Sequence, residues 1–291
     1  MFFFFLYLCG IMHPLYTYII QSLSGLYPDL EVKALAKGIL TDVFGFSAVD
    51  LYAGKDRNFS TKEREKLEDI LSRLKRFEPF QYITGETFFL GHPFYVTHDV
   101  LVPRPETAEL VEWITRDYAS QEGLRVLDIG TGSGCIAVSL ARLLPRSSVL
   151  AWDVSEAALS VARRNAARNG VNVECVRVDV LSHIVAMPDA DIWVSNPPYI
   201  REQEKASMDR NVLDWEPGLA LFVPDNDPLL FYRKIAELGS KHLSSSGVLY
   251  YEINQAYGRE TVELLRSMGY RNVELRKDLS GNDRMVKAER P

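Results

Sequence analysis

Apolar residues in the second half of the chain fall in short runs, and stretches of helical spacing separate several of these runs. Seven such runs predict β-strands. They span residues 125–130, 148–153, 173–179, 191–195, 247–253, 273–276 and 284–288. Helical spacing follows the first, second and fifth runs, over 135–140, 155–169 and 258–268. This alternation predicts an α/β fold with a doubly wound, mostly parallel seven-stranded sheet.

The pattern before this region is helical from Pro14 to about Phe80. An apolar-periodic run opens at Pro28-Asp29 and closes at Gly45, and residues 60–63, Ser-Thr-Lys-Glu, have the spacing of a capping box. We therefore expect a small N-terminal helical domain over residues 12–80. Its role is either to recognise a partner or to cap the fold.

The pattern changes again after residue 80. Strand-like residues at 82–83 and 88–96 surround a glycine-containing turn, which predicts a hairpin linker over 81–105. The sheet-bearing domain then spans 106–291. Pro103 and Pro105 hold Arg104 in an extended segment. That segment places the arginine at the mouth of a site, or it merely ends the linker and starts the next helix.

Composition narrows the class of protein. The 291 residues suit two domains, and 47% hydrophobic with 25% charged residues is ordinary for a globular chain. A net charge of −6 argues against a broad nucleic-acid surface. The arginines at 163, 164 and 168 form a small basic patch, for which a solvated helix face is the simpler interpretation. We expect a monomer without a membrane or a stable nucleic-acid partner.

The cysteines and histidines indicate neither a metal site nor a disulfide framework. Cys9, Cys135 and Cys175 lack the C-x-x-C spacing, and the five histidines form no H-E-x-x-H pattern. A reducing, cytoplasmic location follows.

The apolar stretch at residues 1–11 lacks the charged start and the cleavage site of a signal peptide, and it is too short to span a bilayer. We expect that it lies outside the fold and that translation starts at Met12. A weak membrane anchor is the alternative.

Acidic residues and glycines at the predicted strand ends point to a cofactor site, because ligands of open parallel sheets bind at the carboxyl ends of strands. Residues 128–134, Asp-Ile-Gly-Thr-Gly-Ser-Gly, turn from strand to helix on glycines that permit close approach of a ligand. Asp153 lies 23 residues after Gly130, where an acid accepts hydrogen bonds from ribose hydroxyls. Asp179 ends the third strand, where it would meet an adenine amine. A dinucleotide site is disfavoured because Cys135 replaces the third glycine of its fingerprint.

Residues 195–199, Ser-Asn-Pro-Pro-Tyr, follow the fourth strand and resemble a site that holds a nitrogen. The prolines lack N–H groups and keep the backbone extended, so carbonyl oxygens are left to accept hydrogen bonds. The Asn196 side chain adds another acceptor, and Tyr199 adds a flat aromatic wall. A plain turn is the alternative for this stretch in isolation.

Together, these motifs resemble the class I S-adenosylmethionine-dependent methyltransferases, and among them the peptide-chain release factor glutamine N5-methyltransferase family. The resemblance runs essentially from Met12 to the end. It is carried by residues 80–85, 102–107, 128–134, 195–199 and 281–284. The chain departs from the family in its leader and at Val180, where some relatives have an aromatic residue beside the adenine.

The resemblance implies methyl transfer from S-adenosylmethionine to the amide nitrogen of the glutamine in the GGQ loop of class 1 release factors. The helical domain would then serve substrate recognition. The implied catalytic residues are Asn196, Pro197 and Tyr199, and Pro198 joins them in the substrate-binding set. The implied cofactor-binding residues are Asp128, Gly130, Thr131, Gly132, Ser133, Gly134, Asp153, Asp179, Val180 and Asn196.

Two other functions use the same features. Enzymes of this fold that methylate an adenine or cytosine amine carry similar motifs, although the acidic charge and the absence of a large basic domain count against them here. A non-catalytic nucleotide-binding or scaffold protein is disfavoured by the complete set of acceptors.

Overall fold

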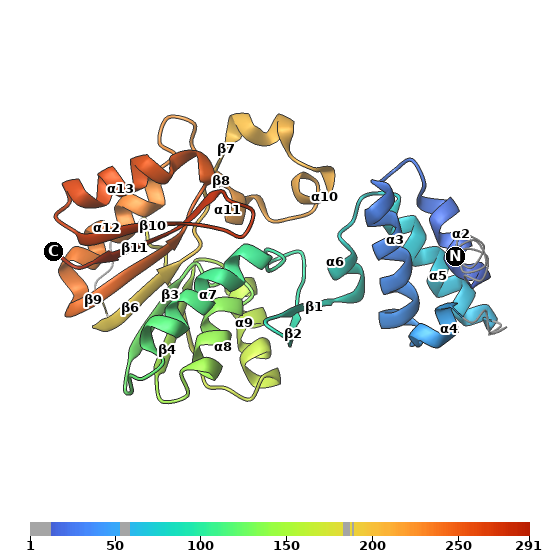
Figure 1. Cartoon of the computed structure of the whole chain (residues 1–291), viewed down its shortest axis with the longest axis horizontal. Helices are drawn as coiled ribbons and strands as arrows, with labels where there is room; N and C mark the ends of the chain where they lie inside the picture. The colour runs from blue at the N-terminus through green and yellow to red at the C-terminus, as the bar shows by residue number, and fades with distance from the viewer. Residues whose placement is uncertain (1–12, 53–58, 183–186, 188) are drawn as a thin grey trace, which may run out of the picture. The chain divides into compact units, whose positions relative to one another are not determined.

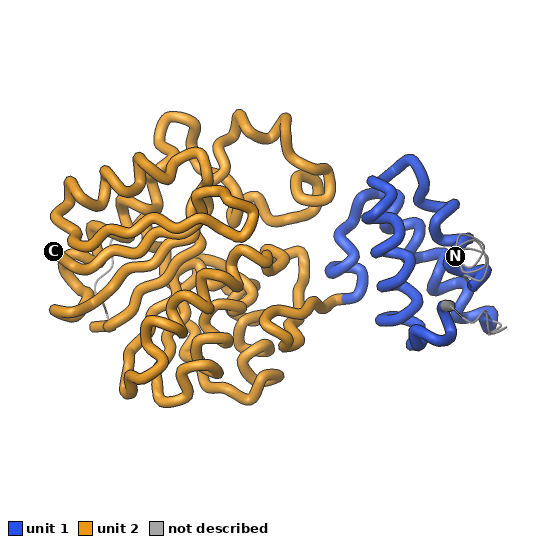
Figure 2. Tube along the Cα trace, viewed as in Figure 1, with its two compact units in different colours: residues 1–84 blue, residues 85–291 orange. Residues whose placement is uncertain are grey.

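The computed structural model of the chain describes residues 13–52, 59–182, 187 and 189–291. Two compact units divide between Thr84 and Gly85 (Figure 2). The apolar leader at residues 1–11 and the expected start at Met12 lie outside the described residues. Within the described residues, no helix is both long and apolar enough to cross a membrane.

The first unit is helical, as the sequence pattern predicts. Its helices are α2 (Pro14–Leu23), α3 (Asp29–Gly38), the π-helical turn η1 (Ile39–Val43), α4 (Ala48–Tyr52), α5 (Thr61–Leu74) and α6 (Phe80–Thr84). The predicted capping box is confirmed: the Glu63 N–H donates to Ser60 Oγ at 3.3 Å, and the Ser60 N–H donates to Glu63 Oε2 at 2.9 Å. Gly45 ends the α3–η1 run at a φ of 66°.

The strand-like prediction at residues 82–83 is wrong, because these residues lie in α6. The N–H groups of Tyr82 and Ile83 both donate to the Pro79 carbonyl, at 2.9 and 3.1 Å. Tyr82 is buried. A short apolar run fits a strand or a buried helical turn equally well, and here Pro79 precedes a helix whose first hydrogen bonds its carbonyl accepts.

The hairpin itself is present, as β1 (Glu86–Phe89) and β2 (His92–Tyr95), paired antiparallel. The hairpin belongs to the second unit, and Asn165 holds it there, since its side chain accepts from the Tyr95 N–H at 2.6 Å and donates to the Tyr95 carbonyl at 2.9 Å. Phe89 and Phe94 are buried in the core of that unit. The hairpin is therefore anchored to the sheet-bearing unit.

The second unit contains the predicted seven-stranded sheet, in the order β10-β11-β9-β6-β3-β4-β5 (Figure 1). β11 runs antiparallel to both of its neighbours, β10 and β9, and the other neighbouring pairs of this sheet are parallel. The strands are β3 (Arg125–Ile129), β4 (Ser148–Asp153), β5 (Glu174–Arg177), β6 (Ala190–Ser195), β9 (Leu243–Glu252), β10 (Arg271–Lys277) and β11 (Asp283–Glu289). The order confirms the doubly wound α/β fold.

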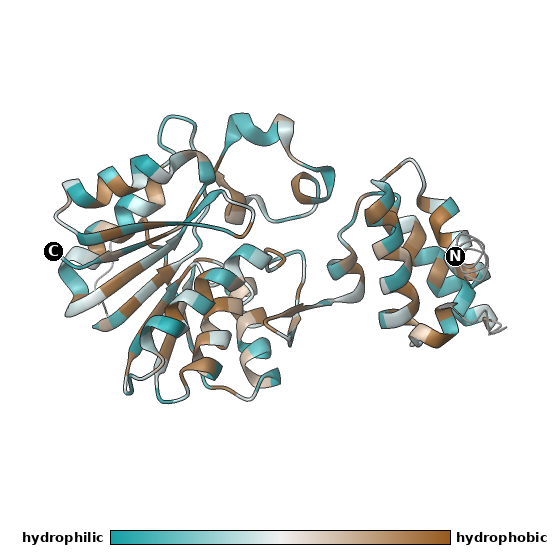
Figure 3. Cartoon of the chain, viewed as in Figure 1, coloured by the Kyte–Doolittle hydropathy of each residue, from teal (hydrophilic) through white to brown (hydrophobic). Residues whose placement is uncertain are grey.

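Helices cover both faces of the sheet (Figure 1). One face packs on α7 (Pro105–Tyr118), α8 (Cys135–Leu143) and α9 (Glu156–Arg168), and the other packs on α12 (Leu230–His242) and α13 (Gly258–Ser267). Successive strand residues point to opposite faces of the sheet. Val126 belongs to the hydrophobic core on the side of α7 and α8, and Leu127 belongs to the core on the side of α12 and α13. This double burial explains the near-continuous apolar runs along the strands (Figure 3).

The segment between β6 and α12 forms only short elements. They are β7 (Ile200–Arg201), η2 (Glu202–Ser207), α10 (Arg210–Leu213), α11 (Gly218–Leu221) and β8 (Phe222–Val223), and a further short turn, η3 (Gln255–Tyr257), precedes α13. β7 pairs parallel with β8.

Candidate active site

Five parallel strands, β9, β6, β3, β4 and β5, end at one edge of the sheet. From β3 the chain continues through β4 to β5 on one side, and it then crosses to β6 on the other side. The topological switch point therefore lies between β3 and β6, where ligands of open α/β sheets bind. Ser195 fixes the two strand ends together, since its Oγ donates to the Ile129 carbonyl at 2.7 Å.

The glycine loop leaves β3 at this edge and is held from below by β4. The N–H groups of Gly130 and Thr131 donate to the Trp152 carbonyl at 2.8 and 2.9 Å. Gly130 and Gly132 have φ angles of 74° and 54°, which residues with a side chain rarely adopt. The backbone path of the loop thus depends on these glycines.

Asp128 is fully buried beneath the loop. Its Oδ2 accepts from Thr131 Oγ1 at 2.6 Å and from the Ala137 N–H at 3.2 Å. Gly134, the N-cap residue of α8, has no side chain, so Asp128 satisfies a free N–H of the first helical turn instead. Burial raises the pKa of Asp128 to about 7.

Asp153 lies at the carboxyl end of β4 and braces the same loop. Its Oδ2 accepts from the Gly132 N–H and its Oδ1 from the Ser155 N–H, both at 2.9 Å. Burial raises the pKa of this carboxyl above its usual range. Each carboxylate oxygen has a second lone pair, so Asp153 is able to accept further hydrogen bonds.

Asp179 and Val180 follow β5, which ends earlier than predicted, at Arg177. Asp179 is exposed, and its Oδ1 accepts from the Leu181 N–H at 2.9 Å. Val180 is buried and belongs to the same hydrophobic core cluster as Trp152. The carboxyl and the apolar side chain therefore differ in exposure although they are neighbours in sequence.

Two observations indicate that a nucleoside-type cofactor fits the glycine loop. A Cβ atom placed on Gly130 or Gly132 would have no described atom within 4 Å, so a ligand is able to approach this backbone. Asp128 Oδ1 is buried without a hydrogen-bond partner among the described residues. Gly134 differs from the other two: its Cβ would lie 3.0 Å from Ala162 Cβ. Close packing of the loop on α9 is therefore the contact that the structure shows for Gly134.

Buried Ser133 is held through its backbone. Its carbonyl accepts from Asn165 Nδ2 at 2.8 Å, the residue that also holds the hairpin. The sequence patterns did not identify Asn165, because an asparagine inside a helix gives no signal of a contact to a distant loop.

Residues 196–199 leave β6 beside the loop. The amide nitrogen of half-buried Asn196 donates to Thr107 Oγ1 at 3.4 Å, while its Oδ1 accepts no hydrogen bond from the residues that the structure describes. Pro197 is buried and Pro198 half-buried. The Tyr199 hydroxyl donates to Glu252 Oε1 at 3.3 Å, and its backbone carbonyl accepts from Asn254 Nδ2 at 3.0 Å. Burial and the nearby Glu252 raise the pKa of Tyr199, so the phenol stays neutral.

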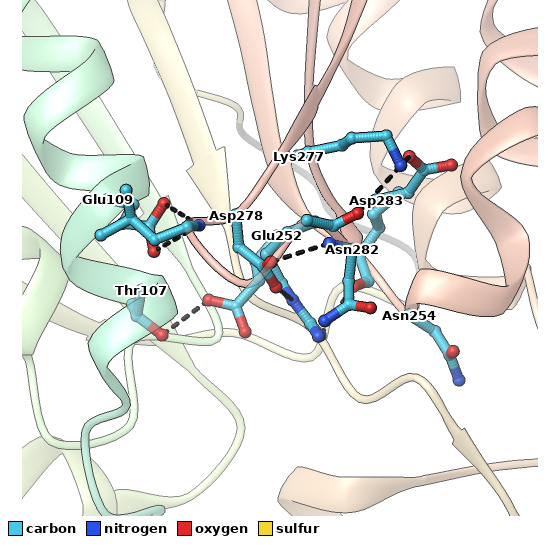
Figure 4. A network of polar contacts seen from close by, with 12 residues as sticks. Thr107, Glu109, Glu252, Asn254, Lys277, Asp278, Asn282 and Asp283 are labelled. Atoms are coloured by element: carbon cyan, nitrogen blue, oxygen red, sulfur yellow. Dashed lines mark hydrogen bonds and ion pairs between the residues drawn. The ribbon is translucent and has the colours of Figure 1, made fainter.

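Thr107 and Glu252 are site residues to which the sequence analysis assigned no role. Thr107 Oγ1 donates to Glu252 Oε2 at 2.6 Å, in the network of polar contacts in Figure 4. Glu252 was identifiable in principle, since it is an acid at the carboxyl end of an apolar strand, as Asp128 and Asp153 are. Thr107 gave no such signal, because 145 residues separate it from Glu252.

Arg104 is extended, as expected, and precedes α7 as its N-cap residue. Its guanidinium pairs with the buried carboxyl of Glu216. This pair ties the start of α7 to the segment that follows β7. Among the residues in the described ranges, no group of three or more His, Cys, Asp or Glu side chains is placed to hold a metal ion.

Both units match known protein families. Residues 16–85 match the family described as PrmC N-terminal domain, and residues 107–213 match the Methyltransferase small domain family. A methyltransferase structure from Pyrococcus furiosus has a TM-score of 0.50 at 18% identity, covering 79% of this chain and 98% of its own, which shows a shared fold.

Two curated relatives are much closer in sequence. The release factor glutamine methyltransferase of Bacteroides thetaiotaomicron is 50% identical over 96% of this chain and 100% of its own length. That of Flavobacterium psychrophilum is 47% identical over 93% of this chain and 96% of its own length. The chain therefore belongs to the release factor glutamine methyltransferase family.

Proposed function

We propose that this chain transfers a methyl group from S-adenosylmethionine to the side-chain amide nitrogen, N5, of the glutamine in the GGQ loop of class 1 release factors. Family membership supports the reaction, because relatives that cover almost the whole chain carry this activity in their names. The observation that carries the proposal is the orientation of Asn196, whose amide nitrogen bonds to Thr107 while its oxygen stays available to a substrate.

The chemistry follows from the weakness of an amide nitrogen as a nucleophile, since its lone pair is delocalised. S-adenosylmethionine supplies an electrophilic methyl group when it is bound. Asn196 Oδ1 and the Pro197 carbonyl are the acceptors that would hold the two hydrogens of the amide and direct its lone pair. Positioning of this kind contributes up to roughly 7–11 kcal/mol. Deprotonation follows transfer readily, so the site needs no strong base.

The residues at the neighbouring strand ends would hold the cofactor. Asp153 would accept hydrogen bonds from the ribose hydroxyls, and Asp179 with Val180 would contact the adenine. The open backbone at Gly130 and Gly132 supports close approach of the remainder, beside Thr131 and Ser133. Buried Asp128 supports the loop from below. Gly134 would contribute through the packing of the loop on α9.

We further propose that the helical unit recognises the release factor and that the enzyme acts as a cytoplasmic monomer. Unit 1 matches a family domain of its own, which supports a dedicated role. The net charge of −6 favours a protein acceptor over nucleic acid. Light scattering of the purified chain tests the monomer directly: a dimer mass would contradict it.

Transfer of labelled methyl groups tests the main proposal. The acceptors are a purified class 1 release factor, the same factor with the GGQ glutamine replaced by alanine, double-stranded DNA and RNA. We expect label only on the unmodified factor. Label on nucleic acid with none on the factor would support methylation of a base amine instead and overturn the proposal.

A further inference from the structure

The buried carboxylate of Glu252 is linked to the acceptor motif by hydrogen bonds. Glu252 ends β9 at 1% exposure, and Thr107 in the first turn of α7 is exposed by 2%. The two Glu252 oxygens have different partners: Oε2 accepts from Thr107 Oγ1 at 2.6 Å, and Oε1 accepts from the Tyr199 hydroxyl at 3.3 Å (Figure 4 shows the Thr107 contact). The carboxylate thus contacts Tyr199 directly and is linked to Asn196 through Thr107.

The single hydroxyl hydrogen of Thr107 determines how the Asn196 side-chain amide is oriented. A threonine hydroxyl has one hydrogen to donate and otherwise accepts. Because that hydrogen is donated to Glu252, the Thr107 oxygen faces Asn196 as an acceptor only. The Asn196 side chain therefore presents its NH2 group to Thr107, and the opposite orientation would place two acceptor oxygens against each other.

Burial makes this arrangement sensitive to the loss of either partner. Desolvation raises the pKa of Glu252. Its hydrogen bonds with Thr107 and Tyr199 and the charge of Arg284 act in the opposite direction, because they favour the ionised form. Hydrogen bonds to charged groups are shorter and stronger than neutral ones, as the 2.6 Å contact with Thr107 reflects. Asn254, two residues beyond Glu252, holds the Tyr199 carbonyl. The end of β9 therefore fixes the motif through two separate contacts.

We propose that Thr107 and Glu252 are positioning residues that hold Asn196 Oδ1 towards the acceptor amide. The relay runs from the Glu252 carboxylate through the Thr107 hydroxyl to the Asn196 amide. Among the described residues, neither Thr107 nor Glu252 hydrogen-bonds to the cofactor loop, and Asn196, at the end of the relay, is the member that would contact the substrate. This inference rests on the proposed function of the site.

Two substitutions at one position test the relay. Thr107→Val keeps the shape of the side chain and removes the hydroxyl, whereas Thr107→Ser keeps the hydroxyl and removes a methyl group. We expect the valine variant to lose about tenfold in kcat, the equivalent of one hydrogen bond, with the dissociation constant for S-adenosylmethionine unchanged. The serine variant should recover most of that loss.

Thr115→Val is the matched control, because Thr115 lies on the same helix and its hydroxyl donates only to the Val111 carbonyl of that helix, at 2.8 Å. Its kcat should equal that of the unsubstituted chain. Thermal unfolding of each variant separates a folding defect from a catalytic one.

Equal kcat values for the valine and serine variants would overturn the relay, whether both match the unsubstituted chain or both fall together. The proposed function fails separately, if the unsubstituted chain leaves the release factor unlabelled. In that case the two Thr107 variants are compared on whichever acceptor the chain does methylate, and equal kcat values there also overturn the relay.

Discussion

The glycines of the cofactor loop should separate into two roles when each is replaced by alanine. Gly134→Ala places a Cβ atom 3.0 Å from Ala162 Cβ and 3.2 Å from its Cα, at a φ of 79°. Gly132→Ala has open space around its Cβ, at a φ of 54°. Both variants pay for the left-handed backbone, about 1–2 kcal/mol, and only the first also forces a methyl group into packed side chains, at about 1–3 kcal/mol.

We therefore expect Gly134→Ala to lower the free energy of unfolding by about 2–5 kcal/mol and Gly132→Ala by only about 1–2 kcal/mol. Urea unfolding without cofactor measures both. Titration calorimetry then measures the affinity for S-adenosylmethionine. Relative to its loss of stability, Gly132→Ala should lose more of this affinity than Gly134→Ala, because its added methyl group occupies space open to a ligand.

Two results would refute this reasoning. If both variants lose the same stability, the contact with Ala162 does not constrain the loop. If Gly132→Ala binds the cofactor as tightly as the unsubstituted chain, the open space above the loop is not where the ligand lies.

Two further predictions concern the acids beside this loop. Asp153→Ala should weaken S-adenosylmethionine binding by roughly 1.5–3 kcal/mol, typical of hydrogen bonds to a charged group, and an unchanged dissociation constant in calorimetry would remove Asp153 from the ribose site. Because the folded-state pKa of Asp128 is raised to about 7, the stability it contributes is present below its unfolded pKa and is lost as the pH rises through about 7. Between about pH 5 and pH 8, the free energy of unfolding should therefore fall by ~2–3 kcal/mol more in the unsubstituted chain than in Asp128→Asn. An equal pH dependence of the two proteins in urea unfolding would contradict this.

The sheet was predictable from sequence because its strands are buried on both faces. Such strands appear as short apolar runs, and the second run matches β4 at both ends, Ser148–Asp153. Strand ends were less predictable. β9 begins at Leu243, four residues before the predicted start, since the serines at 244–246 resemble a loop in sequence although they extend the strand.

The local part of the candidate site was also predictable. The glycine loop and the acids each directly follow an apolar run that predicts a strand, and the structure places them at one sheet edge. The contacts of Thr107, Asn165 and Glu252 were missed because they join residues that only the tertiary fold brings together. The catalytic and binding roles themselves stay predictions until the variants are measured.

The most direct test of the proposed function is to locate the added methyl group on a class 1 release factor by peptide mass spectrometry. The proposal predicts one methyl group on the glutamine of the GGQ loop. It also predicts no methylation with Asn196→Ala, whose affinity for S-adenosylmethionine should stay close to that of the unsubstituted chain. A methyl group on another residue, or full activity of Asn196→Ala, would contradict the assignment of this site.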